Sequence, residues 1–189
     1  MAANAKYNRT YSSSFNLHLK RLTHVQAQIV LTKLEKEAEC NEYDHPEEKK
    51  RFYNLITYLH YFRRNIQEAT LCNKKALDID HESIVAHGTQ AWIYYLEHDP
   101  FQNRKQVEQI LKKVDELCTD RVKLVVAKSE IAYSYARFGL LYYAKAETIY
   151  EEVLNDVESK DITSLYVAVW LLINKMSIIA QSYNSRCYR

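Results

Sequence analysis

The sequence predicts an all-α protein built from antiparallel helix–turn–helix units, and three observations indicate this class. Only two glycines and two prolines occur among 189 residues, whereas sheet-rich folds need many such residues in their turns. Apolar residues recur at helical spacing along most of the chain. A small residue followed by a pair of small or β-branched residues also occurs in three successive stretches, as in helical repeats.

The bulk composition bounds the kind of protein. Hydrophobic residues make up 47% of the chain and charged residues 26%, so a buried core and a globular fold are expected. The net charge of +2 is too small to predict nucleic-acid binding from bulk electrostatics. Residues 1–14 are polar and predict a flexible arm, followed by one helical domain over 15–189. The chain shows neither a signal peptide nor a membrane-length apolar window, which predicts a cytoplasmic protein without membrane contact.

The first helices can be placed from their apolar spacing and their start residues. An N-terminal helix is expected over about residues 16–40. Its apolar positions are Leu19, Leu22, Val25, Ile29, Leu31, Leu34 and Ala38. Asp44 and Pro46 are typical of a helix start, and Glu47 and Glu48 suit the first turn because the helix dipole favours negative charge there.

Three imperfect repeats follow, at about 50–83, 84–120 and 125–158, with a terminal helix at 163–180. Each first helix is expected to place one small residue against the second helix, where the backbones approach closely. These residues are Thr57, Ala91 and Ala132, facing the pairs Ala69 and Ala76, Val107 and Val114, and Ala146 and Val153. Tyr94 and Tyr135 lie three residues after a small position and are expected in the core. Asp99-Pro100 should end one first helix, and Gly139 should end another in a left-handed cap.

The step from Thr57 to Ala91 is 91 − 57 = 34 residues, which is the period of tetratricopeptide repeats. The sequence therefore predicts a tetratricopeptide-type α-solenoid of about three repeats, with a helix on either side. The alternative is a helical bundle whose periodicity arose by chance.

Several stretches resemble the interferon-induced proteins with tetratricopeptide repeats. "NLITYLHYFRRNIQEATLCNKKA" is similar to the first repeat of that family and "HGTQAWIYYLEHD" to its second, while "SEIAYSYARFGLLYYAKAETIYEEVL" shares the lengthened turn of its third. The resemblance covers most of residues 14–155, an N-terminal part of that family's repeat array. It implies a non-enzymatic cytoplasmic protein of the innate antiviral response. Some members bind single-stranded viral RNA at its 5′ end, and others act only through protein partners.

The third repeat carries the family's most informative positions. The resemblance places an aromatic residue and a cation on an RNA channel there, at Tyr133 and Arg137 of this chain. A ring can stack on a base, and an arginine can bind phosphate.

The repeat pattern itself predicts a ligand groove lined by the first helices. The position after each small residue is rotated by about 100° toward the groove. That position and its neighbours one turn later hold the groove residues Tyr58, Tyr61, Phe62, Trp92, Tyr95, Tyr133 and Arg137. The alternative is that these rings pack between repeats, since tyrosine buries well when its hydroxyl finds a partner.

No motif for catalysis or metal binding accompanies the groove. The four cysteines and seven histidines show no ligand spacing, and most of the cysteines are expected to be reduced core residues. We therefore expect a non-enzymatic scaffold without cofactor or metal, which binds a protein segment or mediates assembly. A homo-oligomer could form through an open end of the repeat array. The alternative function is RNA binding, with phosphate contacts from Arg63, Arg64, Lys20 and Arg21.

Overall fold

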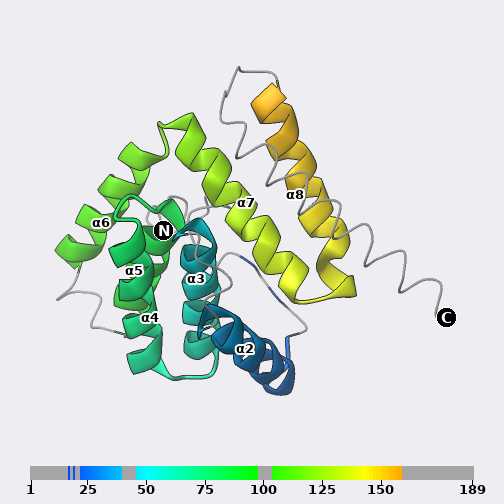
Figure 1. Ribbon diagram of the computed structural model, residues 1–189. Coiled ribbons are helices and arrows are strands. Elements are labelled where there is room, and N and C mark those ends of the chain that lie inside the picture. Colours follow the sequence, from blue (N-terminus) through cyan, green and yellow to red (C-terminus); the bar gives the residue numbers. More distant parts are fainter. Residues whose placement is uncertain (1–16, 18, 20–21, 40–45, 98–103, 159–189) are drawn as a thin grey trace. The chain divides into compact units, whose positions relative to one another are not determined.

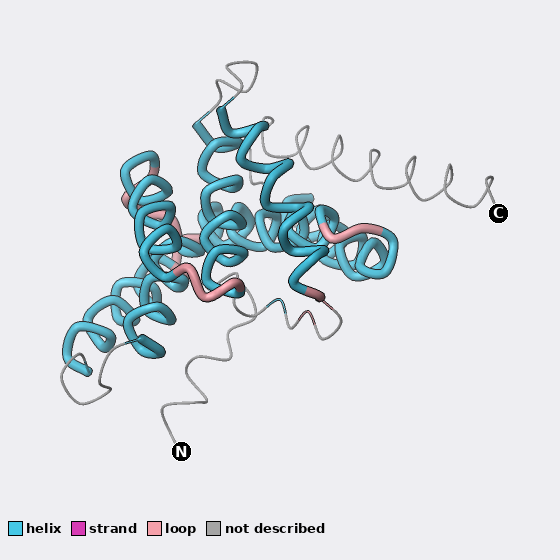
Figure 2. Tube along the Cα trace, turned by 90° about the horizontal axis from the view of Figure 1, so that it is seen from below, coloured by secondary structure: helices cyan, strands magenta, loops and turns pink. Residues whose placement is uncertain are grey.

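The computed structural model describes residues 17, 19, 22–39, 46–97 and 104–158. All regular elements among them are helical, including 3₁₀ geometry at Leu17 (Figures 1 and 2). In chain order they are α2 (His24–Glu39), α3 (Pro46–Phe62), α4 (Ile66–Ile79), α5 (Ile84–Glu97), α6 (Arg104–Leu117), α7 (Arg121–Arg137) and α8 (Leu140–Glu158). The predicted all-α class is confirmed for this part of the chain.

The chain divides into two compact units, Met1–Asp120 and Arg121–Arg189, called unit 1 and unit 2 below. In unit 1 each helix from α2 to α6 packs against the next one, and α3 also contacts α5. In unit 2, α7 packs against α8. The short turns at 63–65 and 138–139 make α3–α4 and α7–α8 antiparallel hairpins (Figure 1). The predicted assignment of residues 15–189 to one domain stays a prediction.

The predicted small positions all lie in the core. Thr57 and Ala91 in unit 1 and Ala132 in unit 2 have no exposed surface. The second-helix residues Ala69, Ala76, Val107, Val114, Ala146 and Val153 are buried as well. A short side chain at these points lets two helices approach closely without a clash. The helical-hairpin pattern of the sequence thus corresponds to buried contacts in the structure.

The helix ends follow from local chemistry. Pro46 is the first residue of α3, and Glu47 and Glu48 occupy its first turn, as predicted. Gly139 has a φ of +85°, which confirms the left-handed turn after α7. Arg64 adopts the same left-handed region, at φ +66°, in the turn after α3. A residue with a Cβ pays about 1–2 kcal/mol for that conformation.

The N-terminal helix starts later than predicted, and only some of its apolar positions are buried. It begins at His24, preceded by Thr23, whose Oγ1 accepts a hydrogen bond from the Gln26 amide at 3.2 Å. Its buried residues are Ala27, Leu31 and Leu34. Val25 and Ile29, two apolar positions of the predicted helix, are 70% and 64% exposed. They lie on the opposite side of α2 because the apolar residues form two stripes and only one faces α3.

Polar contacts join the ends of the hairpins. In unit 1, Lys50 Nζ donates to Asp80 Oδ2 at 2.9 Å, and in unit 2, Lys128 Nζ donates to Asp156 Oδ2 at 2.9 Å. Each pair connects the first helix of its hairpin to the C-terminal end of the second helix. Between α4 and α5 the backbone carbonyl of His81 accepts two bonds. They come from His87 Nε2 at 2.8 Å and Lys113 Nζ at 3.0 Å.

Candidate functional site

The described residues hold no cluster suited to metal binding. Among them no group of three or more His, Cys, Asp or Glu side chains could hold an ion. Cys72 is buried and free, and Cys118 is half-buried and free. Within the same part of the chain, no helix combines the length and the apolar character that crossing a membrane requires.

The aromatic residues predicted on α3 lie in its C-terminal half. Tyr58 is buried, while Tyr61 and Phe62 are half-buried. The rings of Tyr58 and Phe62 are 6.3 Å apart, and that of Phe62 is 5.1 Å from His24 of α2. The contact with His24 was not foreseen, because no spacing in the sequence links the start of α2 to the end of α3.

The equivalent residues on α5 are more open to solvent. Trp92 is half-buried, whereas Tyr95 is 37% and Leu96 is 45% exposed. The rings of Trp92 and Tyr95 meet edge to face at 6.1 Å. Tyr94, predicted as core, is only half-buried. The stretch therefore exposes a ring and an aliphatic side chain near the end of α5.

We group these two sets under one name, the α3/α5 face, because the repeat pattern predicts that they line one groove. It consists of Tyr58, Tyr61 and Phe62 on α3 and of Trp92, Tyr95 and Leu96 on α5. Each α3 position recurs on α5 after 34 residues (92 − 58 = 34), and the two helices are in contact. The 14 residues of α5 include no lysine or arginine. The face is accordingly apolar and aromatic rather than basic.

In unit 2 the predicted pair lies on α7. Tyr133 is buried and Arg137 is half-buried. The Arg137 guanidinium lies 5.7 Å from the centre of the Tyr133 ring, a cation–π distance. Tyr135, predicted as core, is almost fully buried, and Lys145 of α8 lies 4.3 Å from its ring centre. The prediction that Tyr133 and Arg137 share a groove with residues of unit 1 stays a prediction.

The four predicted phosphate contacts fall into two groups. Arg63 and Arg64 are exposed in the turn between α3 and α4. Lys20 and Arg21 lie outside the described residues, as does the predicted helix end at Asp99-Pro100. Only the first two can therefore be related to the α3/α5 face.

A buried histidine lies at the end of α3 beside this face. His60 Nε2 is 3.4 Å from Glu35 Oε1 of α2. Burial lowers the pKa of His60 below its ordinary value, although the Glu35 carboxylate opposes this change. His60 is consequently neutral at physiological pH and contributes no positive charge to the surface.

Comparisons with protein-family models, with curated proteins and with solved structures found no match to this chain. The likeness to interferon-induced repeat proteins therefore rests on the sequence motifs alone.

Proposed function

We propose that this chain is a non-enzymatic, tetratricopeptide-type scaffold whose α3/α5 face binds a protein segment or mediates assembly. The innate antiviral setting is the one that the sequence resemblance implies. The cytoplasm is the compartment expected for such a protein. No catalytic step is part of the proposal.

The observation that carries the proposal is the exposure of apolar side chains at the end of α5. Tyr95 and Leu96 are 37% and 45% exposed, next to the half-buried ring of Trp92. Aromatic residues with an apolar body and a polar tip are enriched where proteins bind one another. A neighbouring helix supplies more rings, so a bound segment would contact two helices at once.

A matched pair of leucines tests this assignment. Leu96 on α5 and Leu71 on α4 are 45% and 48% exposed, so each can be changed to serine with little effect on stability. Random twelve-residue peptides displayed on phage are selected on the 189-residue chain. We expect selected peptides to bind Leu96→Ser roughly tenfold more weakly and Leu71→Ser normally. Peptides that bind both variants equally, or no selected peptide at all, would show that the α3/α5 face is not the binding site.

Assembly is measured with the same variants. If the face joins two copies of the chain, sedimentation equilibrium shows a concentration-dependent dimer that Leu96→Ser abolishes and Leu71→Ser retains. An oligomer that is unaffected by either change would place the contact elsewhere.

A second candidate function, binding of single-stranded RNA, is favoured by Arg137 over the Tyr133 ring and by the exposed Arg63 and Arg64. A gel shift with capped and with 5′-triphosphate RNA tests it. Phosphate contacts are strongest at low salt, so an absence of binding at about 50 mM salt would reject this function.

A further inference from the structure

We propose that the α3/α5 face recognises an acidic protein segment, in which an apolar or aromatic anchor lies beside a carboxylate, and that Arg64 receives the carboxylate. This inference rests on the proposed function and specifies the chemistry of the partner. Three features of unit 1 carry it: the backbone conformation of Arg64, the free charge of the turn, and the position of that charge relative to the face.

The backbone of the turn is of the kind that favours glycine. The amide of Arg64 donates to the Tyr61 carbonyl at 2.8 Å, and the amide of Asn65 donates to the His60 carbonyl at 2.9 Å. This pair of bonds ends a helix with one left-handed residue, usually glycine. Unit 2 follows that preference with Gly139 at φ +85°, whereas unit 1 has Arg64 at φ +66°. An arginine here lowers stability relative to glycine, which points to a use for its side chain.

The charge of the turn is available to a ligand. Arg63 and Arg64 are exposed, and within the described part of the chain neither guanidinium forms an ion pair. The C-terminal end of α3 favours a cation through its dipole, but Arg63 already supplies one. The helix dipole therefore does not account for a second arginine in a disfavoured conformation.

The arginines lie at one end of the α3/α5 face. The chain reverses direction between α3 and α4 and again between α4 and α5, so α3 and α5 run the same way. Their C-terminal ends consequently lie at the same end of unit 1. Phe62 immediately precedes the arginines, and Leu96 is its equivalent on α5.

This distribution of charge favours a protein over RNA. Single-stranded RNA needs cations that follow its phosphates along the groove, and α5 has none. A segment with one apolar anchor and one neighbouring carboxylate matches a face whose cations are confined to one end. Arginine is suited to the role because its planar guanidinium binds a carboxylate through two hydrogen bonds.

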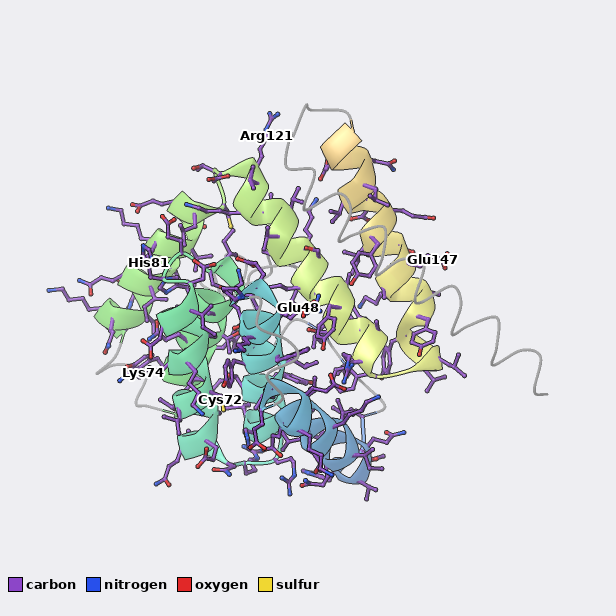
Figure 3. All side chains as sticks on the ribbon, in the orientation of Figure 1. Glu48, Cys72, Lys74, His81, Arg121 and Glu147 are labelled. Carbon is purple, nitrogen blue, oxygen red and sulfur yellow. The ribbon has the colours of Figure 1, made fainter. Side chains whose placement is uncertain are left out.

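The experiment uses the 189-residue chain and the peptides selected from the random library. A peptide of the selected consensus is labelled, and its Kd is measured by fluorescence anisotropy for wild type, Arg64→Gly and Arg64→Gln. Lys74→Gln is the control, because Lys74 is also an exposed cation of unit 1 but lies on α4 (Figure 3). The same peptide with its acidic residue replaced by the amide completes a double-mutant cycle.

We expect the consensus to contain Asp or Glu beside an apolar anchor. Both Arg64 variants should weaken binding roughly tenfold, Lys74→Gln should not, and the amide peptide should be insensitive to Arg64→Gln. Arg64→Gly should also raise the thermal midpoint by roughly 2–4 °C, so its weaker binding cannot come from unfolding.

Other outcomes separate this inference from the proposed function. Peptides without acidic residues, bound regardless of Arg64 but lost in Leu96→Ser, would overturn the inference and leave the function standing. Peptides that are indifferent to Leu96→Ser would overturn both. Arg64-dependent binding of 5′-triphosphate RNA without any selected peptide would replace the protein partner with RNA. A thermal midpoint that falls in Arg64→Gly would refute the argument from backbone conformation.

Discussion

The ammonium group of Lys50 is buried between two carboxylates, which makes its stability contribution measurable. Its side chain is 2% exposed, and Nζ lies 2.9 Å from Asp80 Oδ2 and 2.6 Å from Glu47 Oε2. Asp80→Asn keeps a single acceptor oxygen, whereas the carboxylate accepts from Lys50 through Oδ2 and from the Glu82 amide through Oδ1, each at 2.9 Å. The substitution thus removes the charge and leaves one of these two donors without its acceptor. A charge-assisted bond becomes a neutral one, so we expect a loss of about 1–2 kcal/mol.

This loss can be followed by urea unfolding of unit 1. With a slope of about 2 kcal/mol/M, the midpoint should fall by roughly 0.5–1 M. Trp92 fluorescence gives the readout in a Trp170→Phe background, because the chain has two tryptophans. Asp78→Asn is the control, since Asp78 is an exposed carboxylate on α4, two residues before Asp80. It should change the free energy of unfolding by less than about 0.5 kcal/mol.

Lys50→Met makes the prediction sharper. It removes the buried charge and leaves Asp80 and Glu47, whose side chains are 28% and 43% exposed and can be hydrated. Replacing a buried ion by an apolar side chain is often close to neutral. Asp80→Asn should therefore cost more than Lys50→Met, and the reverse order would refute the reasoning.

The pH dependence of the same pair has a definite sign. Burial raises the pKa of Asp80, but the hydrogen bond and charge of Lys50 outweigh it and hold that pKa below its usual value. Ionised Asp80 therefore contributes its full stabilisation above the pKa of the unfolded chain, about 3.9, and this stabilisation is lost as pH falls through the folded pKa. The difference in urea midpoint between wild type and Asp80→Asn should be constant near neutrality and should disappear below about pH 4. A difference that widens on acidification would contradict the assignment.

Three further predictions follow from buried groups. Ala132→Leu should lower the free energy of unfolding by about 1–3 kcal/mol through overpacking, as measured by urea unfolding, whereas Ala144→Leu on the exposed side of α8 should be nearly neutral. Burial raises the pKa of the Cys72 thiol to about 11, so peptide mass spectrometry should show Cys72 alkylated at pH 8 roughly tenfold or more slowly than Cys118; equal rates would contradict this. Burial lowers the pKa of His87, so His87 destabilises the folded state increasingly as pH falls below the pKa of the unfolded chain, about 6.5. The urea midpoint should therefore fall less between pH 7.5 and 5.5 in His87→Gln than in wild type. An equal fall would exclude His87 as the source of this pH dependence.

The hairpins could be predicted from the sequence because close helix contact restricts residue size strongly. Thr57, Ala91 and Ala132 are small residues at equivalent places of the three predicted repeats, and all three are buried. The face of α2 could not be assigned, since Val25 and Ile29 are as apolar as Leu31 and Leu34. Only the position of α3 decides which stripe is covered.

The candidate site was less predictable for a related reason. Residue type identifies an aromatic position, but neighbouring side chains set its exposure: Tyr58 is buried, while Tyr95 is exposed. The sequence indicated Arg64 only as a possible phosphate contact. Its left-handed φ of +66° is a property of the backbone that residue type alone does not reveal.

The contact of the α4–α5 turn with helices α5 and α6 depends on a main-chain atom. His87 and Lys113 both donate to the carbonyl oxygen of His81, and every amino acid at position 81 would present the same oxygen. Mutational drift at position 81 should therefore leave this contact intact, whereas positions 87 and 113 need donors of suitable reach. In a set of diverged relatives, the packing of the α3–α4 hairpin against α5 and α6 would therefore restrict the residue type at positions 87 and 113. It would not restrict the residue type at position 81 in the turn.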